Sequence, residues 1–183
     1  AIYLEKALER SGMDVDSLDK ALLRYKELSL GDMQAAYSGL LSALHACVNY
    51  RENYYPQKMT SIRKQIALYK AYYNETERQR KTLSEQFALT RRQYARDSLL
   101  YSRSVISSYE HETARASLLQ SRYSLEGAAA SAENLRIQIG EQEQSLLDLT
   151  LERSEKEFTL RQELQTAREQ LLNSMNEWRL RYC

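Results

Sequence analysis

The chain has 183 residues, with five glycines and one proline, and a formal net charge of +1 from 26 basic and 25 acidic residues. Its mean hydropathy of −0.65 is too low for a wide globular core, whereas its content of Leu, Ile and Tyr is too high for a disordered chain. Because the charges are balanced and interspersed, they give no broad field for nucleic acid or anionic lipid, and long helices with narrow apolar stripes fit these facts.

The N-terminal part is expected to form a short helical lead-in over residues 1–31, ahead of a helical domain over residues 32–183. The lead-in is expected to begin with a brief helix. Asp14 or Asp16 can then cap a second helix. Near its end, the residues around Gly31 predict a break followed by a new helix N-cap.

Two apolar stripes follow, separated by the single proline. The first runs from Met33 to Cys47 and the second from Met59 to Tyr101, in alternating steps of three and four residues that indicate a heptad seam. Pro56 suits the first turn of a helix, where its missing N–H costs nothing, so we expect the helix to break or kink just before it. The second stripe consists of Met59, Ile62, Ile66, Tyr69, Tyr73, Thr76, Arg80, Leu83, Phe87, Thr90, Tyr94, Asp97 and Tyr101.

A third stripe follows the same heptad rule and predicts one continuous helix over residues 108–182. Its apolar character is interrupted by Arg153 and Lys156, which stand at seam positions. The stripe consists of Ala114, Leu118, Ser121, Leu125, Ala128, Ala132, Leu135, Ile139, Gln142, Leu146 and Leu149, and later of Leu160, Leu164, Ala167, Leu171, Met175 and Trp178.

The second and third stripes face each other if the chain folds back on itself with the reversal centred between Ser107 and Ser108. Large residues of one seam then meet small residues of the other, as close packing requires. The same register pairs Leu44 with Leu171 on the far side of the proline. The expected seam pairs are Ile66 with Leu149, Tyr69 with Leu146, Leu83 with Ala132, Phe87 with Ala128, and Tyr101 with Ala114.

The sequence therefore predicts an all-α fold built as a long antiparallel two-stranded coiled-coil hairpin. Its descending arm covers residues 32–106 and is interrupted near Pro56. Its tip lies at about residues 105–110, and its return helix covers residues 108–182. The alternative is a three-helix bundle, with residues 33–53 folded back onto the second helix.

Some residues do not fit a purely apolar two-stranded seam. Arg80 and Asp97 stand at seam positions, so a hairpin this thin is expected to derive part of its order from neighbours. Leu147, Leu151 and Phe158 lie off the seam of the return helix. They are expected to receive either the lead-in or a neighbouring molecule.

The reversal contains neither glycine nor proline, and its residues predict local capping instead. Val105 and Ile106 are expected to pack against a partner helix or to cover the end of the seam. Ser107 can cap the return helix through its hydroxyl, and Glu110 completes a Ser-x-x-Glu capping box.

No constellation in the sequence indicates an enzyme. His45 and His111 have no partner at metal-ligand spacing, and no glycine-rich phosphate loop or nucleophile motif occurs. In the predicted register, Cys47 and Cys183 lie too far apart for a disulfide within the chain. We expect no enzymatic activity, no cofactor and no metal.

The stretch from Arg96 to Ala114 carries a spaced pattern around the reversal. It resembles the hairpin tip of the HlyD-type periplasmic adaptors, the membrane fusion proteins, whose pattern is Arg-Leu-x-x-Leu, six residues, Ser, three residues, Leu-Asp-x-Ala. Asp97 and His111 stand where that family has leucine. The resemblance covers roughly residues 30–183. The matching positions are Arg96, Leu100, Ser107, Ala114 and, with Glu in place of Asp, Glu112.

The resemblance implies the helical hairpin of an adaptor that bridges an inner-membrane exporter, often of the ABC type, and a TolC-like outer-membrane channel in secretion or efflux. Its tip would meet the channel, and copies would pack side by side as a hexamer. The protein would be periplasmic and anchored to the inner membrane. Its lipoyl, β-barrel and anchor regions would lie outside this chain, whose ends read as cuts in a longer protein. The expected partner-binding residues are Arg96, Leu100, Val105, Ile106, Ser107, Glu112 and Ala114.

The main rival interpretation is a structural coiled-coil spacer, spectrin-like or cytoskeletal, without a role in transport. Spectrin-like repeats would show three comparable helices and internal self-similarity, which the sequence lacks. A membrane-curving bundle would show a strongly basic face. A segment of the outer-membrane channel itself would show internal duplication.

Overall fold

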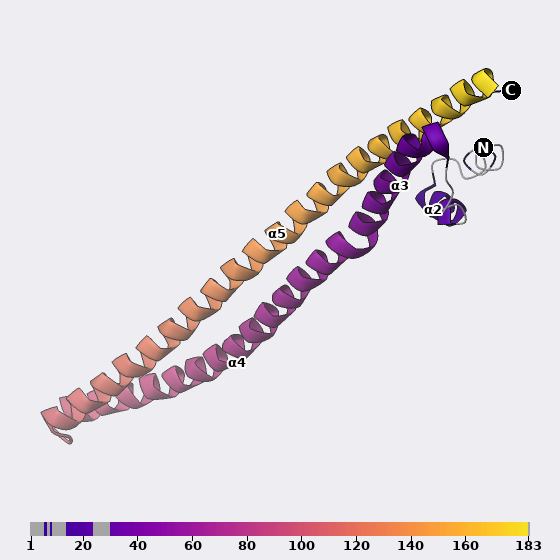
Figure 1. The fold of residues 1–183 in the computed structure, drawn as a ribbon. Helices are drawn as coiled ribbons and strands as arrows, with labels where there is room; N and C mark the ends of the chain where they lie inside the picture. Colours follow the sequence, from indigo (N-terminus) through magenta and orange to yellow (C-terminus); the bar gives the residue numbers. More distant parts are fainter. Residues whose placement is uncertain (1–5, 7, 9–13, 24–29, 183) are drawn as a thin grey trace. The chain divides into compact units, whose positions relative to one another are not determined.

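The computed structural model describes residues 6, 8, 14–23 and 30–182, and every regular element among them is helical (Figure 1). This confirms the predicted all-α class. The brief helix expected at the start of the lead-in lies almost entirely outside the described residues. The elements are α2 (Val15–Leu23), a 3₁₀ turn (Gly31–Met33), α3 (Gln34–Asn49), a π-helical turn (Tyr50–Tyr54), α4 (Tyr55–Ser102) and α5 (Ser108–Tyr182).

The contacts within the chain divide it into two compact units. Unit 1 consists of residues 1–61 and 147–183, and unit 2 consists of residues 62–146. Helices α4 and α5 contribute residues to both units. The range of α5 coincides with the predicted return helix, whereas α4 ends four residues before the predicted end of the descending arm.

Helix α2 begins at a capping aspartate in unit 1. The Asp14 carboxylate accepts hydrogen bonds from the Ser17 hydroxyl at 2.6 Å and from the Ser17 backbone N–H at 3.0 Å, and these bonds lower the pKa of Asp14. Val15, Leu18 and Leu22 then fall on one helical face and are buried. Of the two aspartates predicted as caps, Asp14 is therefore the N-cap of α2.

The predicted break at Gly31 is present, but the helix after it starts differently. Gly31 has a φ of +56°, a left-handed conformation that glycine adopts without steric cost. The new N-cap predicted after Gly31 falls on Asp32, which lies inside the 3₁₀ turn, and neither this turn nor α3 begins with a side-chain capping bond. The backbone N–H of Leu30 instead donates to the side-chain carbonyl of Gln34 at 3.0 Å.

The predicted break before Pro56 takes the form of a π-helical turn. The Tyr55 N–H donates to the carbonyl of Tyr50, five residues back, and the helical run continues from Gln34 to Ser102 without a non-helical residue. One extra residue per turn accommodates the proline, which lacks an N–H and would crowd the carbonyl four residues earlier. The alternative in which residues 33–53 fold back onto the second helix is therefore wrong.

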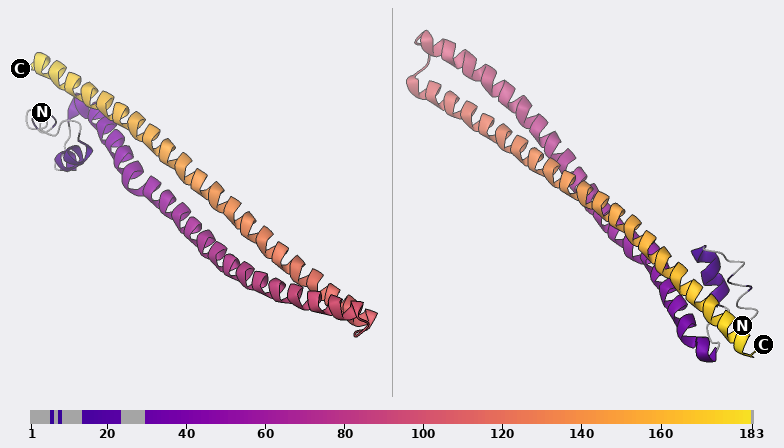
Figure 2. Two further views of the ribbon diagram at one scale, coloured as in Figure 1. Left: turned by 180° about the vertical axis from the view of Figure 1, so that it is seen from behind. Right: turned by 90° about the horizontal axis from the view of Figure 1, so that it is seen from above.

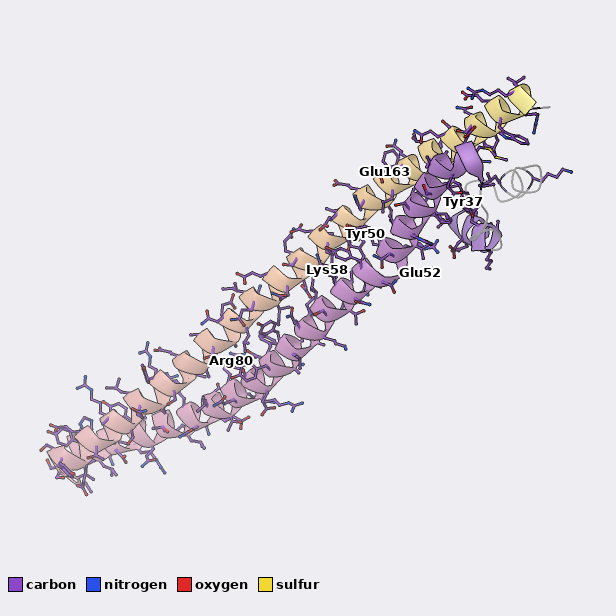
Figure 3. All side chains as sticks on the ribbon, in the orientation of Figure 1. Tyr37, Tyr50, Glu52, Lys58, Arg80 and Glu163 are labelled. Carbon is purple, nitrogen blue, oxygen red and sulfur yellow. The ribbon has the colours of Figure 1, made fainter. Side chains whose placement is uncertain are left out.

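Three tyrosines gather at this turn. The rings of Tyr50, Tyr54 and Tyr55 lie 5.0 to 5.9 Å apart. Lys58, which is labelled with Tyr50 in Figure 3, lies over the ring of Tyr54 at 4.5 Å. Tyr55 is 1% exposed, and its hydroxyl donates to the Glu152 carboxylate on α5 at 3.1 Å. Burial and this bond raise the pKa of Tyr55 to about 12. The cluster fixes the π turn against α5.

The core of unit 1 is built from three segments. The lead-in contributes Leu8 as well as α2, which lies beside α3 in Figure 1 and shares one core cluster with residues of α5. The Arg168 guanidinium donates to the Leu8 carbonyl at 3.1 Å, and the Cys47 thiol contacts the Leu160 carbonyl at 3.4 Å. Burial raises the pKa of the Cys47 thiol. The members of this core cluster that are 0 or 1% exposed are Leu8, Leu18, Leu22, Tyr37, Leu40, Leu44, Leu164 and Leu171.

The described residues of the lead-in do not cover Leu147, Leu151 and Phe158 on α5. Leu147, Leu151 and Phe158 are 52%, 56% and 65% exposed. The described lead-in residues pack instead around α3 and the seam of α5, since they share one core cluster with Leu40 and Leu164. The described part of the lead-in therefore does not pack on the off-seam residues, and their contact with a neighbouring molecule stays a prediction.

The predicted register is also wrong in unit 1. Cys47 lies against Leu160, and Leu44, one turn earlier, is therefore level with about Leu164 rather than with the predicted Leu171. A displacement close to one heptad brings seam residues back onto seam residues, so the apolar pattern alone could not exclude it. The seam residues themselves are correct, since Leu149, Leu160, Leu164, Leu171 and Met175 are all buried.

In unit 2 the seam positions are covered less completely. Ile66, Thr76, Ser121, Ala132 and Leu135 are buried. Lys70 of α4 forms an ion pair with Glu143 of α5 at 2.7 Å. Figure 2 shows the two helices meeting at the turn. The other predicted seam residues of this unit, Tyr69, Leu83, Phe87, Ala128 and Leu146, are half-buried. Arg80 is exposed and turns to Glu77 on its own helix.

Candidate partner-binding site at the turn of unit 2

The turn between α4 and α5 spans residues 103–107. At its start, the Val105 N–H donates to the Leu100 carbonyl at 3.0 Å and the Ser104 N–H donates to the Tyr101 carbonyl at 2.9 Å. These two bonds form a Schellman motif, which satisfies the last carbonyls of α4. The reversal therefore begins earlier than the expected tip at residues 105–110.

Ser104 occupies the position of this motif where glycine is usual. Its φ of 57° lies in the left-handed region, which costs a residue with a Cβ about 1 kcal/mol. The chain thus reverses without glycine because a serine accepts the strained conformation. No sequence pattern marks this position.

The predicted capping box is confirmed at the start of α5. The Ser107 N–H donates to the Glu110 carboxylate at 2.8 Å, and the Glu110 N–H donates to the Ser107 hydroxyl oxygen at 3.2 Å. The bonds from Ser107 lower the pKa of Glu110. Both ends of the turn are thus closed by hydrogen bonds, which holds its exposed side chains on a rigid support.

A histidine joins the two helices next to the turn. The His111 ring stacks on Tyr101, with ring centres 4.6 Å apart, and on Tyr94 at 5.5 Å. Its Nε2 lies 3.1 Å from the Ser98 hydroxyl. Tyr101 therefore faces His111 and not the predicted Ala114.

Sequence reasoning missed this contact, although a signal was present. His111 lies three residues before Ala114, so it continues the α5 seam backwards by one regular step. It stands where the adaptor pattern has leucine, and it fills that seam position as a flat ring between two tyrosines. A polar residue in a seam near a helix end can thus indicate a stacked side chain.

Large apolar side chains are exposed around the turn. Leu99 is 54%, Val105 66% and Tyr109 77% exposed. Beside them, a groove of ≈ 340 Å³ is lined from α4 by Tyr94 and from α5 by Ser117, among others. Exposed apolar groups on a rigid turn favour contact with another macromolecule.

The structure places the seven predicted partner-binding residues in unit 2, on the turn or within about two helical turns of it. Leu100, which is 37% exposed, and Ser107 carry the hydrogen bonds that shape the turn. Ile106 and Ala114 are half-buried. Arg96, Val105 and Glu112 are exposed.

Comparison of the chain with known protein families, with curated proteins and with solved structures found no match. Among the described residues, no helix combines the length and the apolarity that crossing a membrane requires. The same part of the chain contains no group of three or more His, Cys, Asp or Glu side chains arranged to hold a metal ion.

Proposed function

We propose that the chain is the helical hairpin of a periplasmic adaptor, which bridges an inner-membrane exporter, of the ABC type, and a TolC-like outer-membrane channel in secretion or efflux. In this proposal α4 and α5 form an antiparallel coiled coil, and the turn at residues 103–107 is its tip. The observation that carries the proposal is the rigid turn with exposed Leu99, Val105 and Tyr109.

The chemistry of the turn suits a contact between helix ends. Val105 and Tyr109 expose apolar surface to water. A partner that covers this surface gains about 25 cal/mol of binding free energy for each Å² removed from water. The capped backbone around Ser104 and Ser107 needs no further hydrogen bonds from a partner. Arg96 and Arg103 are exposed near these apolar side chains and place positive charge at the edge of the proposed contact. Charges at the edge of an interface orient the partner more than they increase the affinity.

The remaining parts of the proposal follow from the same role. The hairpin would lie in the periplasm, and its exporter would be contacted by regions outside this chain. Copies would pack side by side around the conduit, six in the assembled pump. The chain itself would be a scaffold and would carry out no reaction.

The test is binding of the full 183-residue chain to a purified TolC-like channel in detergent, measured by biolayer interferometry. Val105→Asp should weaken binding at least about tenfold, because a carboxylate at the centre of an apolar contact loses its water. Leu180→Asp is the matched control, since Leu180 is 87% exposed and lies in unit 1. Circular dichroism checks that both variants keep their helix content.

An export assay tests the same substitutions in the assembled pump. With the hairpin in place of that of an HlyD-type adaptor, Val105→Asp and Leu100→Asp should abolish export, while Leu180→Asp should preserve it. Unchanged channel binding and export with Val105→Asp would contradict the assignment of the tip. That result would favour a structural spacer.

A further inference from the structure

Helix α5 carries a second apolar row in unit 1, in addition to its buried seam. The row consists of Leu147, Leu151, Ser154 and Phe158, which follow one another in alternating steps of four and three residues. This is the spacing of a heptad seam. The three large side chains, Leu147, Leu151 and Phe158, are 52%, 56% and 65% exposed. These four residues are called the outer row.

The spacing of the outer row continues along α5 beyond unit 1. The same steps towards the N-terminus reach Ile137, Tyr123 and Leu119, which are 53%, 74% and 56% exposed. In unit 2, however, the row also contains Glu126 and Glu133. The part in unit 1 is therefore the part that can pack as an uninterrupted uncharged seam.

The outer row lies on the side of α5 opposite to its seam. A helix turns about 100° per residue, so Leu151 points about 200° away from the buried Leu149. From Leu147 to Phe158 the row is about 17 Å long, which is about three helical turns. A helix bound along the outer row would therefore leave the core of unit 1 intact.

The charges beside the outer row are acidic. In a heptad pattern, the positions that flank a seam lie next to the partner helix and pair with its charges. On one edge of the outer row these positions are Asp148 and Glu155, which are exposed. On the other edge they are Thr150 and Glu157, and Glu157 binds Arg153 of its own helix at 2.7 Å. Neither edge carries a basic residue between Leu147 and Phe158.

The other charged residues of this stretch contact the chain itself. Glu152 and Lys156 contact tyrosines of the π-helical turn, and Arg153 is held in the ion pair with Glu157. Arg161 stands at the next position of the row and ends its uncharged part. A molecule that covers the outer row therefore meets an apolar strip between acidic edges.

We infer that the outer row binds an amphipathic helix of another protein, with large apolar residues in heptad spacing and with Lys or Arg along its flanks. Charge complementarity selects this occupant. A second copy of the chain would set acidic edge against acidic edge in either orientation, because both edges carry only acidic charges. Acidic edges also disfavour an anionic membrane surface. The inference is independent of the proposed function, which uses the turn of unit 2.

The test is binding of a synthetic helical peptide to the full 183-residue chain, measured by fluorescence anisotropy. The probe peptide has leucine at the heptad seam positions and lysine at the flanking positions, and a matched peptide has glutamate in place of lysine. Both are used at concentrations where they are monomeric. The lysine peptide should bind at least about tenfold more tightly, and this difference should shrink as salt is added.

Substitutions in the outer row test where the peptide binds. Leu147→Asn with Leu151→Asn removes apolar area and should raise the dissociation constant of the lysine peptide at least about tenfold. The matched control is Leu89→Asn with Leu180→Asn, at leucines that are 64% and 87% exposed and lie outside the row. This control should leave the dissociation constant unchanged. Circular dichroism checks that both double variants keep their helix content.

Charge reversal tests the chemistry of the partner. Asp148→Lys with Glu155→Lys should reverse the preference, so that the glutamate peptide binds more tightly than the lysine peptide. The inference would be overturned by a wild type that binds neither peptide, by equal binding of the leucine double variant and its control, or by an unchanged preference after charge reversal. A wild-type dimer that Leu147→Asn with Leu151→Asn abolishes would assign the row to a second copy and overturn it as well.

Discussion

The two units use the same heptad pattern, yet they bury it to different degrees. In unit 1, Leu40 and Leu164 are 0% exposed, whereas in unit 2 the most deeply buried seam residues include Ala132 at 4% and Ile66 at 8%. The difference arises because unit 1 has a third segment, Leu8 and α2, packed on its two helices. Two helices alone cover only a narrow seam, and a third element is required for a core that excludes water.

The largest expected effect is the loss of a core leucine in unit 1. Leu164→Ala should lower the free energy of unfolding by about 3 kcal/mol, because the side chain is fully buried and leaves a cavity. Chemical denaturation measures this value. Leu180→Ala, at a side chain that is 87% exposed, is the control and should change stability by less than about 0.5 kcal/mol. A loss below about 1 kcal/mol for Leu164→Ala would mean that unit 1 has no true core.

The same truncation in unit 2 should cost less. Leu83 is a half-buried seam residue, and Leu83→Ala should lower the free energy of unfolding by about 1 kcal/mol, since part of its area is already in water. The same denaturation experiment compares the two leucines directly. If Leu83→Ala and Leu164→Ala lowered the free energy of unfolding equally, the two units would not differ in how well they bury their seams.

The turn offers a stabilising substitution. Ser104→Gly should raise the free energy of unfolding by about 0.5 to 1 kcal/mol, because glycine adopts the positive φ without strain and that gain exceeds its extra entropy in the unfolded chain. Ser102→Gly, inside the last turn of α4, is the matched control and should destabilise the protein. Destabilisation by Ser104→Gly would show that residue 104 is not in the left-handed conformation.

The smallest expected effect is a pH dependence at the capping box. The folded state lowers the pKa of Glu110 below its ordinary value of 4.5, so the bonds to Ser107 stabilise the fold above that pH. This contribution is lost as the pH falls from 4.5 through the lower folded pKa. The stability difference between wild type and Glu110→Gln should therefore shrink over that range in denaturation curves. A difference that is constant with pH would mean that the carboxylate does not cap α5.

Much of the helical content could be predicted from the sequence, because heptad spacing is a local property. Spacing and residue type alone predict the seam of α5 and the capping box at Ser107. The break before Pro56 is also predicted, but its form as a π turn is not, since a helix can absorb a proline in more than one way.

The register and the packing of the lead-in could not be predicted in the same way. A shift of about one heptad keeps seam on seam, so Leu44 could not be assigned to Leu164 rather than to Leu171 without three-dimensional contacts. The lead-in carries too short a pattern to choose between two faces of α5. At the turn, Ser104 and His111 act through backbone conformation and ring stacking, which residue spacing does not encode.

The most direct test of the hairpin is the distance between α4 and α5 in unit 2. Spin labels at Lys70→Cys and Glu143→Cys, in a chain with Cys47→Ala and Cys183→Ser, can be measured by pulsed dipolar spectroscopy. The ion pair at 2.7 Å predicts a short label separation that persists when labelled chains are diluted with unlabelled ones. A long separation, or a short one that disappears on dilution, would contradict the antiparallel arrangement within one chain.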